Sequence, residues 1–228
     1  MTPKSCVLPS QSMYYSMPDS ALHLIETWLA ANAPRILHES LNPGASEEVL
    51  AALEKAVGRP LPDDYKTLYR WHNGLDEEAE NFGNFAYGLS FLPLEEVTAN
   101  VHSRKQDAEA FPLARTAAEV RADNVLNPYW VSLGFDGSHA WLHVDLDPTP
   151  AGTYGQVIFL DEVEETAFLV ASSVTSFLSD FARDLQQDLY SLNPDALQED
   201  DNEFLAPDPT IDLVNWYNAH RWQSVPRP

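Results

Sequence analysis

The stretch YWVSLGFDGSHAWLHVDL, residues 129–146, decides the fold class because its apolar residues alternate along the chain. Alternation with a period of two is typical of a β-strand that buries one face. Asp136-Gly137 divides the stretch and is a strong signal for a tight hairpin turn. The stretch therefore predicts two antiparallel strands. The residues expected to face the core are Val131, Leu133, Phe135, Ala140, Leu142, Val144 and Leu146.

The other side of this hairpin is the predicted partner-binding surface. It carries His139, Trp141, His143 and Asp145, with Asp136 at the turn. Tryptophan is enriched at protein interfaces, so an exposed Trp141 between two histidines favours contact with a partner. The alternative is that a neighbouring helix or the C-terminal extension covers Trp141, and the pattern does not decide between them.

The same residues do not predict a metal site. On a strand, four residues span about 13 Å, so His139 and His143 lie too far apart to share one zinc ion. The acidic run at 199–203 lacks the spacing and the glycine of a calcium-binding loop. We therefore expect no metal ion.

Signatures of catalysis are also missing from the sequence. It contains no Gly-rich phosphate loop, no dinucleotide fingerprint and no nucleophile elbow. The carboxylate pairs Glu47-Glu48 and Asp63-Asp64 are explained by the first turns of helices, where they complement the helix dipole. We expect no catalytic residue, no cofactor and no enzymatic activity.

Helical patterns flank the hairpin on both sides and complete an α+β fold. We predict N-terminal helices, a central twisted and mostly antiparallel sheet, and a packing helix after the sheet. Residues 82–91 suggest an irregular strand, and residues 106–127 show no clear pattern. The predicted helices begin at Ala21, after Ser46, at Pro62, at Pro93 and after Ser173; further strands are predicted at 156–160 and 167–171.

The domain organisation follows from where these patterns begin and end. Residues 1–18 are polar and are interpreted as a loose N-terminal arm. Residues 19–192 form the predicted α+β domain. Residues 193–228 are interpreted as an acidic linker followed by a short C-terminal helix from Thr210.

The charge of the chain limits its partners. The sequence has 13 Lys and Arg against 35 Asp and Glu, a formal net charge of −22. Such a chain repels nucleic-acid phosphates and anionic membranes and attracts basic proteins. With no apolar run long enough to span a bilayer, no secretory signal and a single cysteine, Cys6, we expect a cytoplasmic protein.

Several segments, taken in order, resemble the Smi/Knr-like family of the SUKH superfamily. They are GASEEVLAALEKAVGRPLPDDYKTLYRWHNG (44–74), FLPLEEV (91–97), the hairpin stretch and VASSVTSFLSDFARDL (170–185). The resemblance covers about residues 20–190. Its most specific matches are Trp28, Gly44-Ala45-Ser46, Leu53-Glu54, Gly58, Leu61-Pro62, Asn73-Gly74, Asp145 with Asp147, and Gly155-Gln156-Val157-Ile158.

The resemblance implies an α+β domain that binds proteins without catalysis. Bacterial members resemble immunity proteins that neutralise toxins, often nucleases, whereas fungal members regulate cell-wall assembly. This chain lacks the long flanks expected of the fungal type, so we expect a bacterial immunity protein that binds a basic toxin. The alternative is a regulatory or scaffold module that binds endogenous proteins.

Overall fold

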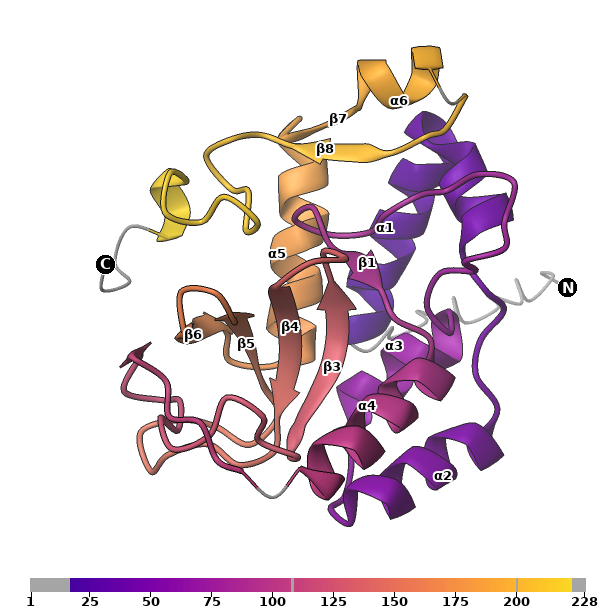
Figure 1. Ribbon diagram of the computed structural model, residues 1–228. Helices are drawn as coiled ribbons and strands as arrows, with labels where there is room; N and C mark the ends of the chain where they lie inside the picture. The colour runs from indigo at the N-terminus through magenta and orange to yellow at the C-terminus, as the bar shows by residue number, and fades with distance from the viewer. Residues whose placement is uncertain (1–16, 108, 200, 223–228) are drawn as a thin grey trace, which may run out of the picture.

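Six strands form one sheet in the computed structural model, which describes residues 17–107, 109–199 and 201–222 (Figure 1). Their order across the sheet is β1-β3-β4-β5-β6-β2, and every neighbouring pair is antiparallel except β2 and β6. The strands are β1 (Ser90–Phe91), β2 (Arg115–Thr116), β3 (Trp130–Phe135), β4 (Ala140–Asp145), β5 (Gln156–Asp161) and β6 (Thr166–Ala171). Together with the helices below, they confirm the predicted α+β class.

The predicted hairpin is confirmed between β3 and β4. Gly137 takes up the left-handed conformation that the turn requires, with φ of 83°. One carboxylate oxygen of Asp136 accepts the backbone N–H groups of Ser138, His139 and Ala140 at 2.8 to 2.9 Å. Asp136 therefore stabilises the turn.

The helices after Ser46 and after Ser173 start where local signals predicted. The first helix starts at Met17 rather than at Ala21, and the helices expected at Pro62 and Pro93 start one residue later. The hydroxyl of Ser46 accepts the N–H of Val49, and that of Ser173 accepts the N–H of Ser176. The elements are α1 (Met17–Asn32), a π-helical turn η1 (Ile36–Ser40), α2 (Glu47–Val57), α3 (Asp63–Trp71), α4 (Leu94–Gln106), α5 (Val174–Gln186), α6 (Pro194–Glu199) and a 3₁₀ turn η2 (His220–Trp222).

Asn73-Gly74, a pair typical of left-handed helix caps, does not close α3. The chain leaves α3 in an extended conformation at His72, and Gly74 becomes left-handed, with φ of 72°, only afterwards. The side chain of Asn73 instead accepts the N–H of Leu94 at 3.0 Å. It thereby caps α4, a helix that follows it in the chain.

One face of the sheet packs against α5, which lies behind the sheet with α1 beside it (Figure 1). The side chains that meet there are almost fully buried; they include Leu142, Val144 and Phe159 from the sheet and Phe177, Leu178 and Phe181 from α5. Burial of large apolar side chains is the main stabilising contribution to such a fold.

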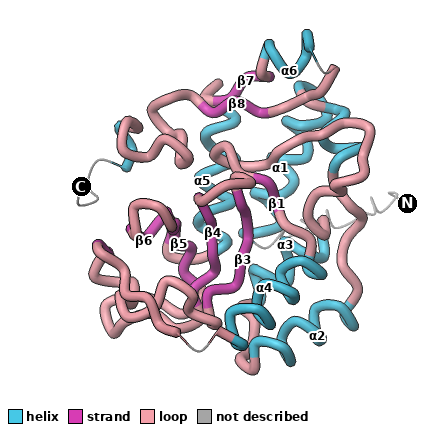
Figure 2. The backbone as a smooth tube through the Cα atoms, viewed as in Figure 1, coloured by secondary structure: helices cyan, strands magenta, loops and turns pink. Residues whose placement is uncertain are grey.

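The opposite face of the sheet is covered by the connection between α4 and β3. This connection is almost entirely loop and lies at the lower left of the view (Figure 2). Its Leu113 and Val120 pack with Trp130, Ile158 and Leu160 in a second apolar cluster. Residues 106–127 thus bury a face of the sheet although their sequence shows no periodic pattern.

The predicted strand over 82–91 is wrong except at its end. Only Ser90 and Phe91 pair with β3, and the chain before them makes a tight turn through Tyr87, whose φ is 56°. Phe85 and Tyr87 are buried, but Phe82 is 57% exposed. The near-alternation of aromatic residues here reflects an irregular loop with a buried side.

The predicted acidic linker and C-terminal helix are also wrong. Residues 190–192 and 205–207 pair as the antiparallel strands β7 (Tyr190–Leu192) and β8 (Leu205–Pro207). Beyond them the chain forms turns and η2, and its apolar side chains enter the main core: Leu205, Ile211, Leu213, Trp216, Ala219 and Trp222. The segment is part of the folded domain.

A buried ion pair fixes the end of this segment. Arg221 donates both terminal nitrogens to the carboxylate of Asp184, which is fully buried on α5. The hydroxyl of Tyr87 donates to the same carboxylate at 2.7 Å. A paired and hydrogen-bonded charge of this kind is tolerated inside a protein.

The N-terminal arm predicted for residues 1–18 lies almost wholly outside the described residues, as does Cys6. Its last two residues, Met17 and Pro18, begin α1. None of the helices described above combines the length and the apolar character needed to cross a bilayer.

Candidate protein-binding site

The five residues predicted to contact a partner do not share one exposed surface. His143 and Asp145 are completely buried, so the expectation that they face solvent is wrong. The covering connection between α4 and β3, together with Arg104 of α4, lies over this face. Asp136, His139 and Trp141 are partly exposed near the hairpin turn, and their contact with a partner stays a prediction.

A row of stacked rings runs across this face of the sheet. The ring of Trp141 lies 3.8 Å from that of Phe135 and 5.7 Å from that of His143, and His143 stacks in turn with Trp130 at 6.2 Å. The Arg104 guanidinium lies 5.6 Å from the Trp141 ring. The half-buried Trp141 is therefore held by its neighbours, as a structural residue is.

The contact between Arg104 and His143 disfavours a positive charge on the histidine. Nη2 of Arg104 lies 3.2 Å from Nε2 of His143, and arginine can only donate, so Nε2 accepts. Burial and the neighbouring guanidinium hold the pKa of His143 well below its usual value. Burial also lowers the pKa of Arg104 to about 10. His143 is thus neutral at physiological pH.

Several buried polar atoms around this row have no hydrogen-bond partner in the described part of the chain. They are Nε1 of Trp130, Oγ of Ser132, Nε1 of Trp141 and Nδ1 of His143. Leaving such groups unpaired when they are buried costs free energy.

The described residues place no group of three or more His, Cys, Asp or Glu side chains where they could hold a metal ion. His139 points its ring nitrogens towards Asp136 and Asp161, at 3.7 and 4.0 Å. These contacts are electrostatic, and the three residues do not form a set of metal ligands.

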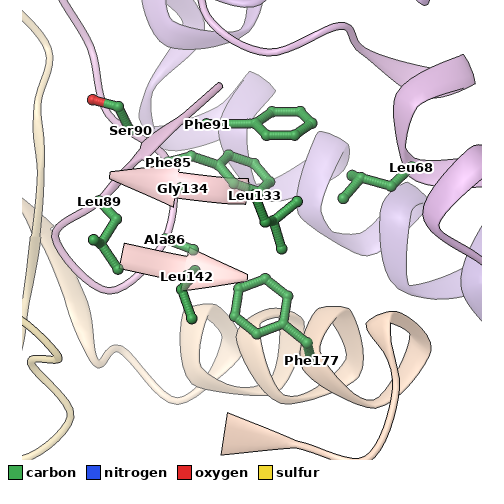
Figure 3. A pocket seen from close by; sticks show the side chains of 10 residues that line it. All are labelled: Leu68, Phe85, Ala86, Leu89, Ser90, Phe91, Leu133, Gly134, Leu142 and Phe177. Atoms are coloured by element: carbon green, nitrogen blue, oxygen red, sulfur yellow. The ribbon is translucent and has the colours of Figure 1, made fainter. Parts of the chain in front are cut away.

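The apolar cavity in the core is too small for a substrate. It measures about 10 Å³, room for about one water molecule, and lies between the sheet, the loop before β1 and α5 (Figure 3). Phe177 points into it from α5 towards Leu142, and the Ser90 hydroxyl, its one side-chain polar group, points away (Figure 3). The lining therefore offers no group for chemistry.

A different surface combines acidic side chains with an exposed aromatic ring. Phe82 is 57% exposed and borders a hollow of about 60 Å³ between the loop before β1 and β1 itself. Asp76 and Glu77 line it, and further acids follow in the same loop and in the first turn of α4. We call this set the acidic-aromatic surface: Asp76, Glu77, Glu78, Glu80, Phe82, Glu95 and Glu96.

The acids of this surface have no cationic partners. None of the six forms an ion pair within the described chain, whereas acids elsewhere, such as Glu47 with Arg70, do. Burial, reinforced by the charge of Glu77, raises the pKa of Glu96 above its usual value. The surface therefore carries negative charge that the protein itself does not neutralise.

Two buried asparagines hold Phe82 in place. Asn81 exchanges hydrogen bonds with the backbone of Glu203, and Asn84 does so with the backbone of Leu205. The N–H of Phe82 itself donates to Oδ1 of Asn202 at 2.9 Å. The aromatic pattern predicts a strand at Phe82 and so does not reveal this site; the signal in the sequence is an aromatic residue two positions after an acidic run.

Comparison with known proteins now assigns the family. A profile described as the SMI1 / KNR4 family (SUKH-1) matches residues 44–180, more than half of the chain. The chain belongs to this family. The SMI1/KNR4 match includes both the hairpin and the acidic-aromatic surface, while α1 and the C-terminal strands lie outside it and pack on the same core. The predicted resemblance is confirmed.

Two fungal relatives of this chain are proteins named as regulators. The chain is 26% identical over 195 residues to the cell wall biosynthesis/cell cycle regulator smi1 of Schizosaccharomyces pombe, and the match covers 78% of this chain and 37% of the relative. It is 25% identical over 245 residues to the glucan synthesis regulatory protein of Neurospora crassa, covering 90% and 44%.

A shorter match extends beyond fungi. Human F-box only protein 3 is 41% identical over 61 residues, which is 27% of this SMI1/KNR4 chain and 13% of the relative. The chain spans less than half the length of any of these relatives. The expected bacterial origin finds no support among them, because they come from fungi and a mammal.

Proposed function

We propose that this chain is a non-catalytic regulatory module that binds endogenous proteins, in the manner of the cell-wall assembly regulators. The observation that carries the proposal is the match to named fungal regulators along most of the chain. These relatives favour the regulatory role over the immunity role.

The geometry of the site supports binding rather than chemistry. The acidic-aromatic surface presents fixed negative charge and an exposed ring, which suit recognition of another macromolecule. Electrostatic complementarity of this kind mainly provides association rate and specificity.

A second candidate is the immunity protein, and the net charge of −22 is the observation that favours it. A protein that neutralises a basic toxin profits from steered, fast association. Both candidates bind proteins, and they differ in what they bind: resident proteins in one case, a toxin domain in the other.

Affinity capture of the full chain from its own cells, with chemical crosslinking before lysis, tests the proposal. A regulatory module recovers resident proteins of wall or glucan synthesis and of the cell cycle, and their recovery supports the proposal. Recovery of one toxin domain in equimolar amount supports the second candidate and contradicts the first. Recovery of no protein above a denatured-bait control contradicts both.

A further inference from the structure

The ring of Phe82 is exposed and available for contact with a partner. Its side chain is 57% exposed, yet the residues around it are fixed by the hydrogen bonds of buried Asn81 and Asn84. An exposed apolar side chain on a fixed stretch of backbone loses less conformational entropy on binding than one on a mobile loop. Phe82 therefore has the physical character of an interface anchor.

The hollow beside Phe82 has an apolar floor and acidic walls. Leu75, Phe91 and Leu92 form the buried floor, and Asp76 and Glu77 stand at the side. Its volume of about 60 Å³ lies between that of one water molecule and that of a benzene site. An aliphatic side chain is the group that fits such a space and such a floor.

The edge of the sheet next to this hollow is already satisfied. The N–H of Leu75 donates to the carbonyl of Phe91 at 2.8 Å, on the side of β1 away from β3. A partner strand therefore cannot simply extend the sheet here as in β-augmentation. Recognition has to use side chains.

The charge around the hollow specifies the rest of the partner. The six acids of the acidic-aromatic surface make no ion pair in the described residues, and Glu77 and Glu96 repel each other. Lysine or arginine side chains that reach them relieve this repulsion and gain charge-assisted hydrogen bonds.

We infer that the acidic-aromatic surface docks a basic peptide segment that inserts one aliphatic side chain into the hollow beside Phe82. This inference rests on the proposed function and names the surface and the partner chemistry for it. Any segment of Lys and Arg around a single Leu or Ile satisfies the surface, so the partner is a basic region of another protein.

Fluorescence anisotropy with a labelled probe peptide, KRKLKRK, tests the inference with the full chain in the presence of EDTA. The probe KRKSKRK, which lacks the aliphatic side chain, should bind at least about fivefold more weakly. Phe82→Ser should weaken the binding of KRKLKRK by at least about fivefold. Phe111→Ser, at a phenylalanine that is 48% exposed, should change it by less than about twofold.

A charge-matched pair of triple variants separates the site from the net charge. The first triple variant combines Glu77→Gln, Glu78→Gln and Glu80→Gln. The second, the control, combines Glu109→Gln, Glu119→Gln and Asp123→Asn. The first should weaken binding of KRKLKRK at least about fivefold more than the control. Both triples change the net charge equally. Circular dichroism and urea titration establish that each variant is folded.

Four outcomes overturn the inference: no binding of KRKLKRK, equal affinity for KRKSKRK, no effect of Phe82→Ser, or equal losses in the two triples. They leave the proposed function standing if crosslinked capture still recovers resident proteins, which then bind elsewhere on the chain. Failure of capture with retained probe binding rejects the proposed function instead.

Discussion

Asn84 pairs with the backbone of Leu205 in place of a strand neighbour. Its Nδ2 donates to the Leu205 carbonyl at 2.8 Å, and its Oδ1 accepts the Leu205 N–H at 2.7 Å, although 121 residues separate the two. Both groups are buried. One side chain thereby satisfies both backbone groups at the start of β8 and ties the loop before β1 to the C-terminal segment.

Replacing Asn84 should destabilise the whole domain. Asn84→Ala leaves both backbone groups of Leu205 without partners, which should lower the free energy of unfolding by about 2–4 kcal/mol in a urea titration. Asn218→Ala, at an exposed asparagine, should change it by less than about 0.5 kcal/mol. Similar values for the two variants would show that the Asn84 contacts contribute nothing.

The C-terminal segment should behave as core. Trp216 is 1% exposed and its indole donates to Asp161 at 3.0 Å, whereas the neighbouring Tyr217 is 46% exposed. Trp216→Ala should therefore cost about 3–5 kcal/mol of stability in thermal or urea unfolding. Tyr217→Ala should cost less than about 1 kcal/mol. A stable Trp216→Ala protein would restore the linker interpretation.

Asp145 should make a measurable contribution to pH dependence. Burial raises its pKa from 3.8 to about 6, so the folded protein binds this proton more tightly than the unfolded chain. Its contribution to stability is complete below about pH 4 and is lost as the pH rises through about 6, a change of about 3 kcal/mol.

Asp145→Asn should remove this contribution. The free energy of unfolding of both proteins is measured by urea titration at several pH values. The wild type should gain stability relative to Asp145→Asn as the pH falls from about 7 to about 4. Asp123→Asn, at an exposed aspartate, serves as the control for the loss of one carboxylate. A constant difference for Asp145→Asn would mean that its pKa is normal.

Substitutions at two glycines distinguish the free-energy cost of a steric clash from that of an unfavourable backbone conformation. A Cβ at Gly44 would lie 2.0 Å from the carbonyl oxygen of Arg70, while one at Gly137 would meet nothing within 4 Å. Gly44→Ala should therefore cost about 3 kcal/mol, since backbone must move. Gly137→Ala should cost only about 1 kcal/mol for its left-handed φ. The reverse order in thermal unfolding would contradict the packing described at Gly44.

The features that could be predicted from the sequence are those set by neighbouring residues. The turn at Asp136-Gly137 and the caps at Ser46 and Ser173 depend on hydrogen bonds within four residues, so local reading finds them. The class of fold follows from the two periods of the apolar residues.

The rest depends on contacts that no local pattern records. His143 and Asp145 alternate correctly for an exposed face, but an aperiodic loop some 20 to 30 residues earlier covers them. The C-terminal segment hides core residues such as Leu205 among acids. Phe82 was assigned to a strand, and its exposure follows from side-chain bonds to distant backbone.

Site-specific photo-crosslinking inside the source cells tests the central claim most directly. A benzoylphenylalanine is placed in separate variants at position 82, at position 111 and at position 141. The account predicts a crosslinked protein at position 82, joined through a basic segment, and none at position 111. A crosslink at position 141 alone, or none at any position, would contradict it.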